Sequence, residues 1–356
     1  GWTCRKPLSM RKAARKRENT MPDLSTNYLG LSLKNPLVPS SSPLSHKLDP
    51  LLHLEDAGAA AIVLHSLFEE EVRHEEQMLD RFLLNPDSFG ESSGHLPLRD
   101  SYQSKLDHYL EQVSQLKQRL SIPLIASLNG TTPGGWLELG REIQAAGADA
   151  LELNSWFMPC DPHTSGAEQE EQYLALLRAL KTTVQIPICL KLSPFFSSLP
   201  HFVQQAQTAG AAGVSLFNRF FQPDIDLQTL RIVDSVQLSR SADALLTMRW
   251  IAVLHGRSNL SLAATGGVHS ADDALKMLLA GADAVHMASA LLQRGPQVLG
   301  EVLQGIQSWM EQHEYHSVSQ LKGALSQKNQ SDPSRFARAA YLNTLDSFSP
   351  PPGVRY

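Results

Sequence analysis

The sequence predicts an α/β protein built as one (β/α)8 TIM barrel, with long loops at the C-terminal face of its strands. The chain has 356 residues, 42% hydrophobic and 19% charged, so it can bury a large core. A phrase around Ala-Gly-Ala recurs with a short apolar run after it, at 57–66, 146–154, 209–218 and 280–289. Further apolar runs lie between these copies. Eight alternating strand–helix units favour a closed parallel barrel over an open doubly wound sheet.

Each copy of the repeat predicts the end of a helix and the start of a strand. Its glycine suits a left-handed helix end, and the apolar residues that follow suit a strand buried on both faces. The predicted strands span 36–41, 60–66, 123–129, 150–154, 187–193, 213–218, 261–267 and 284–289. The predicted helices span 48–57, 103–120, 134–146, 168–183, 197–209, 242–255, 270–280 and 296–312.

These elements place the barrel in residues 22–326, between a disordered basic leader at 1–21 and a C-terminal tail at 327–356. Met21 is the natural start of the folded part. Some connections are too long for simple turns and follow strand C-termini, where barrels carry their active sites. These long connections are 67–102, 155–167 and 219–241.

Composition excludes several classes of partner. The net charge is -5 and no basic face is evident, so we expect no nucleic acid. No apolar run is long enough to cross a membrane. Cys4, Cys160 and Cys189 fit neither a zinc site, a disulfide framework nor the cysteine set of an iron–sulfur cluster. We therefore expect a cytoplasmic protein without a metal site.

The ends of the last two strands carry a candidate phosphate site. Gly266 and Gly267 end the seventh strand, and Ala288 and Ser289 end the eighth. Backbone N–H groups at glycines and helix N-termini bind anions, and this pair of loops is the usual phosphate grip of such barrels. A tight turn is the alternative explanation of the two glycines.

Lys191 is the most informative single residue, because it interrupts an apolar strand at an inward-facing position. Its ammonium group can stabilise the N1–C2=O edge of a reduced flavin, or it can pair with a neighbouring carboxylate such as Glu152. Asn154 and Asn218 end the fourth and sixth strands, where amides either bind a heterocycle or cap loops. Other polar residues expected near the same mouth are Ser40, Ser41, His65, Ser127 and Asn129. A structural role is the alternative for His65, and the run Glu69–Glu71 is interpreted as a solvated face.

Taken in order, these segments resemble the dihydroorotate dehydrogenase family, over about residues 24–326. The similar segments are 28–36, 151–154, 190–194, 266–268 with 272–274, 280–285 and 295–296. The resemblance implies an FMN-dependent barrel that works as a homodimer. It implies ring contacts from Lys191 and Asn154, and flavin and substrate contacts from Asn218. It also implies that Ser40 and Ser41 pack near the flavin, and that Gly266, Gly267, Ala288 and Ser289 hold the phosphate.

Several positions depart from the family pattern. Phe157 stands where the family has a Cys or Ser general base, and the nearby Cys160 is the candidate replacement, with a spectator cysteine as the alternative. His65 replaces an expected lysine. Arg219 replaces a small hydroxyl residue and favours an anionic substrate, unless it only forms a surface ion pair. The family's asparagine-rich substrate loop is not evident in 67–102.

The sequence thus predicts an FMN oxidoreductase acting on a CH–CH bond of a small anionic compound, with pyrimidine metabolism implied by resemblance. A separate subunit would supply electron transfer. Two alternatives stay open: a flavin-free barrel lyase or isomerase acting on a phosphorylated substrate, and an FMN electron-relay subunit without its own base.

Overall fold

The computed structural model describes residues 21–84, 103–130, 133–155, 160–219, 223–337, 339–347 and 349. Eight parallel strands form one sheet in the order β3-β12-β11-β8-β7-β6-β5-β4. Their bounds are β3 (Leu37–Pro39), β4 (Ile62–Phe68), β5 (Leu124–Asn129), β6 (Ala150–Asn154), β7 (Ile188–Leu192), β8 (Gly213–Leu216), β11 (Ser261–Thr265) and β12 (Ala284–Met287). The two end strands approach each other, because Ala60 N donates to Leu37 O at 3.0 Å. The predicted (β/α)8 barrel is confirmed.

Eight helices cover the strands at the places that the sequence predicts, each within two residues at either end. They are α1 (Leu48–Asp56), α3 (Lys105–Arg119), α4 (Pro133–Ala145), α5 (Gly166–Lys181), α6 (Leu199–Thr208), α7 (Ala244–Leu254), α8 (Ala271–Ala280) and α10 (Val298–Gln312). Ser104, Ser165 and Ser270 begin α3, α5 and α8 with capping boxes, which satisfy backbone N–H groups at the helix start. None of the helices in the described ranges is long and apolar enough to cross a lipid bilayer.

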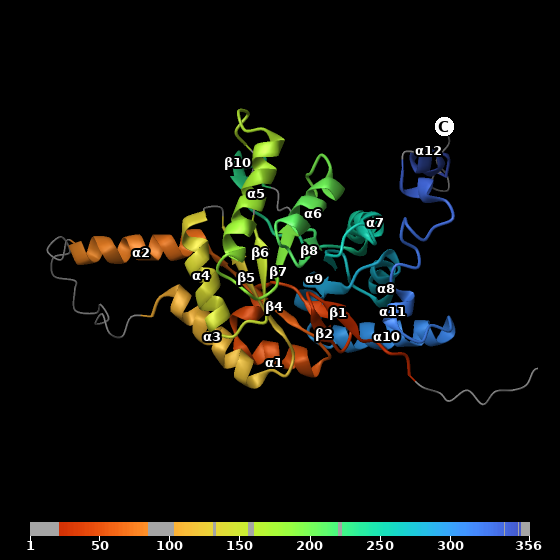
Figure 1. The fold of residues 1–356 in the computed structure, drawn as a ribbon, viewed down its shortest axis with the longest axis horizontal. Helices are drawn as coiled ribbons and strands as arrows, with labels where there is room; N and C mark the ends of the chain where they lie inside the picture. Colours follow the sequence, from red (N-terminus) through yellow and green to blue (C-terminus); the bar gives the residue numbers. More distant parts are fainter. Residues whose placement is uncertain are drawn as a thin grey trace, which may run out of the picture.

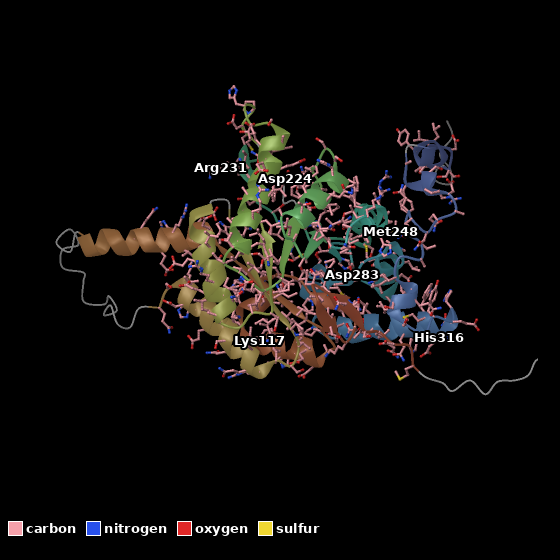
Figure 2. The ribbon with its side chains drawn as sticks, viewed as in Figure 1. Lys117, Asp224, Arg231, Met248, Asp283 and His316 are labelled. Carbon is pink, nitrogen blue, oxygen red and sulfur yellow. The ribbon has the colours of Figure 1, made fainter. Side chains whose placement is uncertain are left out.

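The recurring Ala-Gly-Ala phrase has one local geometry. Its glycines, at positions 58, 147, 210 and 281, have φ between 102 and 124°. In two copies an aspartate follows and ties the new strand to the preceding one. Asp149 accepts a hydrogen bond from Leu124 N at 2.7 Å and pairs with Lys117, and Asp283 accepts one from Leu262 N at 2.8 Å. Figure 2 shows Lys117 low in the view, at the end of the barrel where the strands begin.

Some elements lie inside connections that the sequence leaves as loops. Helix α2 (Glu69–Leu84) projects sideways from the barrel (Figure 1). Its start corrects the interpretation of Glu69–Glu71 as a solvated face: Glu69 is buried and accepts a hydrogen bond from Trp136 Nε1 at 2.9 Å, whereas Glu70 and Glu71 are exposed. The other such elements are the hairpin of β9 (Asp224–Asp226) and β10 (Arg231–Val233), and the short helix α9 (Ser289–Arg294).

The predicted terminal segments are described only in part. The basic leader lies outside the described residues except for Met21. Beyond α10 the chain forms α11 (Val318–Leu321), η6 (Pro333–Phe336) and α12 (Ala339–Asp346).

A small hairpin closes the end of the barrel where the strands begin. It consists of β1 (Thr26–Tyr28) and β2 (Leu31–Leu33). Tyr28, Leu29 and Leu33 are buried and pack into the barrel interior against a layer of small and apolar side chains. This apolar layer contains Val38, Ala61, Val63, Ile125, Ala150, Cys189, Ala263 and Ala284.

Above this layer the barrel interior is polar. Side chains alternate across a strand, so a residue two positions beyond a member of the apolar layer also points inward. We call the set so placed the interior polar layer: Ser40, Ser127, Glu152, Lys191, Thr265 and His286, together with Ser215, which follows Gly213 of β8 by two positions; all of them are buried. Polar groups are costly inside a barrel, so this layer identifies the end of the strands that carries a site.

Candidate active site

A cavity of about 1660 Å³ opens at the C-terminal ends of the strands, above the interior polar layer. Most residues that the sequence nominates lie on its wall, although they come from all eight strands of the barrel. These are Ser40, Ser41, His65, Asn129, Asn154, Lys191, Asn218, Arg219, Gly266, Gly267, Ala288 and Ser289. Ser127 is not on the wall: it is fully buried and exchanges a 2.8 Å hydrogen bond with Ser66 Oγ.

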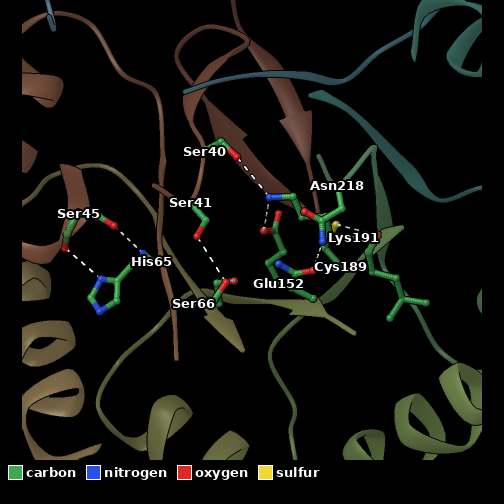
Figure 3. A network of polar contacts seen from close by, with 12 residues as sticks. Ser40, Ser41, Ser45, His65, Ser66, Glu152, Cys189, Lys191 and Asn218 are labelled. Carbon is green, nitrogen blue, oxygen red and sulfur yellow. Dashed lines mark hydrogen bonds and ion pairs between the residues drawn. The ribbon is translucent and has the colours of Figure 1, made fainter. Parts of the chain in front are cut away.

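Lys191 forms the pair with Glu152 that the sequence allowed, and it also lies on the cavity wall. Its Nζ lies 3.2 Å from Glu152 Oε1 and donates to Ser40 Oγ at 3.5 Å (Figure 3). The ammonium also lines the cavity, where its third N–H remains available to a ligand. Burial opposes a lone charge, and the adjacent carboxylate offsets that cost. The cavity floor therefore carries an ammonium group held in position from below.

Asn154 and Asn218 meet across the cavity wall, because Asn218 Nδ2 donates to Asn154 Oδ1 (Figure 3). The backbone N–H of Asn218 donates to Leu192 O at 2.7 Å, which positions the residue beside the end of β7. This bond leaves the side-chain carbonyl of Asn218 as an acceptor and the side-chain N–H group of Asn154 as a donor for a ligand. Two neighbouring amides of this kind suit a planar heterocycle with both carbonyl and N–H edges.

The predicted phosphate cradle lies at the ends of β11 and β12 and is completed by Ser239. Gly267 N donates to Ser239 Oγ at 3.2 Å, and Ser239 Oγ donates to Ser289 Oγ at 2.9 Å. Ser239 N also donates to Ser289 Oγ, at 3.0 Å. Gly266 has φ +91° and open space where a Cβ would stand, so its backbone is accessible from the cavity. Ser289 Oγ accepts both bonds from Ser239 and keeps its own hydroxyl proton for an anion, beside the accessible backbone of Gly266.

His65 belongs to a cluster on the opposite side of the mouth. Its Nδ1 lies 3.2 Å from Ser45 O, and a carbonyl only accepts, so Nδ1 carries the proton and Nε2 is left as an acceptor. Its ring lies 4.0 Å from that of His46 and meets Tyr109 edge to face at 5.1 Å. Burial, and then the charge of His46, lower the pKa of His65 to about 4. His65 is therefore neutral at physiological pH, unlike the lysine it replaces.

Arg219 lies at the rim of the cavity and is partly buried. Its Nη1 lies 3.5 Å from Asp243 Oδ2, so the ion pair that the sequence allowed is present. The guanidinium still lines the cavity and has further donors.

Cys160 is not brought to the cavity. Its side chain is exposed and it is absent from the cavity wall, shortly before Ser165 begins α5. Phe157, which stands at the family's base position, lies outside the described residues. The other described thiol, Cys189, is buried in the apolar layer, and burial raises its pKa far above the usual range. Neither described cysteine lines the cavity.

Sequence reasoning missed three residues on or beside the wall. His286 follows Ala284 by two positions, so the rule that identifies Lys191 also identifies it. Ser239 and His269 meet at 3.4 Å from segments that only the fold brings together, and no local pattern marks them.

Comparison with known proteins agrees with this geometry. The family model for dihydroorotate dehydrogenase matches residues 23–310. The catalytic subunit of dihydroorotate dehydrogenase B (NAD(+)) from Pyrococcus abyssi is 27% identical over 308 residues, covering 84% of this chain and 98% of that protein. The subunit of the same name from Thermoplasma acidophilum is 25% identical over 321 residues, covering 85% and 99%. The solved structure of an Eimeria tenella DHODH in complex with ferulenol shares the fold, with a TM-score of 0.59, 16% identity and coverage of 86% and 89%.

Proposed function

Because this chain belongs to the dihydroorotate dehydrogenase family, we propose that it binds FMN and oxidises or reduces a CH–CH bond of a small anionic compound. It is an oxidoreductase of the dihydroorotate dehydrogenase type. We take the compound to be a pyrimidine-like heterocycle. The paired amides of Asn154 and Asn218 support this choice, because they offer both a donor and an acceptor to such a ring.

The residues present fit FMN at both of its ends. A phosphate needs donors without bulk: Gly266 leaves space, and the Ser289 hydroxyl, which accepts two bonds from Ser239, keeps its own proton to donate. A flavin ring needs a hydrogen-bonding edge at the floor, which Lys191 supplies from the interior polar layer. The cavity, at about 1660 Å³, leaves room for a second molecule beside the cofactor. In this proposal Ser40, Ser41 and Asn129 contact the cofactor from neighbouring strands.

When bound, FMN supplies the redox chemistry that no side chain of the protein has. The part of Lys191 is electrostatic: its fixed ammonium stabilises negative charge that develops on the ring edge beside it. Glu152 pairs with that ammonium and orients it from below, at 3.2 Å. Ser40 limits its movement on the other side, at 3.5 Å.

Oxidation of a CH–CH bond removes a hydride from one carbon and a proton from its neighbour. Asn154 and Asn218 orient the substrate ring, and Arg219 and His65 at the rim bind its polar groups. Arg219 suits a carboxylate. The proton needs an acceptor, and we propose the sulfur of Cys160, which would have to move to the substrate from its exposed position outside the cavity wall. This part of the proposal rests on the sequence alone.

We further propose a homodimer that hands electrons to a separate subunit in the cytoplasm. The relatives named as catalytic subunits support a partner chain. The absence of a basic face supports small-molecule rather than nucleic-acid partners.

The buried ammonium of Lys191 on the floor of a cavity with a phosphate cradle at its rim is the observation that carries the proposal. The test is to purify the protein, identify any flavin, and titrate it anaerobically with dihydroorotate and other dihydropyrimidines. Bleaching of the flavin absorption by one of these compounds is the expected result. A colourless protein that binds a phosphorylated substrate indicates a lyase or isomerase instead. Reduction only by a partner reductase indicates an electron-relay subunit.

A further inference from the structure

His286 is a buried polar side chain for which the structure offers no protein partner. It is 1% exposed, lies on β12 within the interior polar layer, and lines the floor of the cavity. Neither Nδ1 nor Nε2 has a hydrogen-bond partner among the described residues. Buried polar groups in folded proteins are nearly always satisfied, and an exception calls for a ligand or an ordered water.

The groups around His286 are already engaged with one another. Tyr28 meets the imidazole edge to face at 5.7 Å, but its hydroxyl lies 3.3 Å from Cys189 Sγ. Lys191 bonds to Glu152 and Ser40. The ring of His286 is therefore fixed by packing from below, while its hydrogen-bonding capacity is left for the cavity.

His286 is neutral throughout the physiological range. Burial, and then the nearby charge of Lys191, lower its pKa to about 3. A neutral imidazole has one donor and one acceptor nitrogen, whereas an ammonium can only donate. His286 can thus do what Lys191 cannot: accept a hydrogen bond from an N–H group of a ligand, or bond to a ring edge without adding charge.

We propose that His286 is a cofactor-positioning residue, which hydrogen-bonds the heterocycle of the bound flavin beside Lys191. This inference rests on the proposed function. It makes the segment from β12 to the start of α9 hold the cofactor at two places, because Ser289 of the phosphate cradle follows His286 by three residues. Three residues of chain span at most about 10 Å, a length suited to the ribityl chain that separates ring from phosphate.

The two floor residues then divide the task. Lys191 supplies charge, which favours the reduced ring. His286 orients the ring, because a hydrogen bond to a neutral imidazole forms only in a defined geometry. A flavin that lacks this contact is held less tightly and sits in a less polar environment, so both its affinity and its reduction potential change.

The experiment compares His286→Leu and His286→Gln in the full-length protein. The dissociation constant of FMN is measured by fluorescence quenching on flavin-stripped protein, and the midpoint potential by spectroelectrochemical titration. We expect His286→Leu to weaken FMN binding on the order of tenfold and to shift the potential. His286→Gln, which keeps a donor and an acceptor, should stay within about threefold of wild type.

A stability measurement separates this role from packing. A leucine removes an unsatisfied polar group from the ligand-free protein, so its melting temperature should not fall even though FMN binding weakens. Ser215→Ala is the matched control, because Ser215 Oγ is also buried without a partner in the same layer but does not line the cavity. This control should leave both FMN affinity and potential unchanged.

A direct readout comes from protein labelled with ¹⁵N-histidine. Addition of FMN should shift an imidazole signal that is missing from His286→Gln. Unchanged affinity, potential and imidazole signal in these experiments overturn the role of His286 and leave the proposed function intact. Equal losses in the Leu and Gln variants also overturn it, as packing then explains the effect. A wild-type protein that binds no FMN overturns the proposed function, and this inference with it.

Discussion

Lys191 Nζ and Glu152 Oε1 lie 3.2 Å apart on neighbouring strands, and both side chains are buried. Neither group is tolerable alone at that depth, since an unpaired charge in a protein interior costs several kcal/mol (roughly 3–5 when one partner of such a pair is removed). The pair is therefore one unit, and a variant of either member must be judged against the other.

Replacing Lys191 affects both the proposed flavin chemistry and the stability of the fold, and the two effects can be measured separately. We expect Lys191→Ala or Lys191→Met to lose flavin retention or reduction and to lower the free energy of unfolding by roughly 3–5 kcal/mol, because Glu152 is left uncompensated. Chemical denaturation and flavin content after gel filtration measure the two effects.

The double variant Lys191→Met/Glu152→Gln is the control for this prediction. Removing both charges should restore most of the stability but none of the flavin reduction. Normal FMN content and reduction kinetics in the single variant would refute the role of Lys191.

The two glycines of the cradle should differ in their response to alanine. At Gly266 (φ +91°) a Cβ meets nothing within 4 Å, so Gly266→Ala should cost only backbone strain, about 1–2 kcal/mol. At Gly267 (φ +77°) a Cβ lies 2.3 Å from Ala244 N, so α7 must shift and the loss should be larger. Thermal denaturation ranks the two. Equal losses of stability in the two variants would mean that α7 shifts to make room for the Cβ at little cost in free energy.

Ser289 should matter to the cofactor more than to the fold. Ser289→Ala removes the acceptor of Ser239 N and of Ser239 Oγ, which loosens the cradle. We expect FMN affinity to fall on the order of tenfold. Ser261→Ala is the matched control, because it removes an acceptor of Leu29 N at the other end of the barrel. If both variants lower FMN affinity alike, the cradle does not bind phosphate specifically.

Stability should rise with pH through the range in which His65 titrates in the unfolded chain. The folded pKa is about 4, below the ordinary value of 6.5, because burial and His46 disfavour the charged ring. As pH falls, His65 therefore takes up a proton in the unfolded state before it does so in the folded state. The stability that the neutral ring contributes is fully present above about pH 6.5 and is lost as pH falls towards 4.

We expect the free energy of unfolding of His65→Gln to depend less on pH than that of the wild type. The dependence that remains is due to other buried histidines such as His286. Urea denaturation across this pH range measures it. Parallel curves for variant and wild type would show that His65 is not buried in solution.

The proposal that Cys160 exchanges the substrate proton has a direct kinetic test. Cys160→Ala should slow flavin reduction by on the order of 10²–10⁴, with FMN affinity unchanged, because only proton transfer is removed. Stopped-flow reduction by the identified substrate measures the rate. An unchanged rate makes Cys160 a bystander, in keeping with its exposed side chain outside the cavity wall.

The barrel was predictable because its signals are local. The glycine of each Ala-Gly-Ala phrase has a positive φ, and the apolar run after it forms a strand within two residues of the predicted bounds. Lys191 was predictable for the same reason, because a charge inside an apolar strand is visible in the sequence. His286 satisfies the same rule and was overlooked.

What the sequence could not show depends on contacts between distant segments. Glu69 looks like part of a solvated acidic run, and only Trp136, from a different strand–helix unit, explains its burial. The acidic residues at 69–71 suit the first turn of a helix, and they are the local signal for the start of α2. Ser239 reaches the cradle from a long connection, and no spacing in the sequence reveals where that segment returns.

The hairpin of β1 and β2 has a consequence for the order of events at the site. Among the described residues, Tyr28, Leu29 and Leu33 close one end of the barrel, so a ligand reaches and leaves the floor through the mouth at the opposite end. A cofactor bound on the floor must therefore bind first, and a substrate or product that binds later covers it. The cofactor can then dissociate only after the substrate or product has left. Saturating amounts of a tightly bound product should therefore protect the protein against loss of its cofactor.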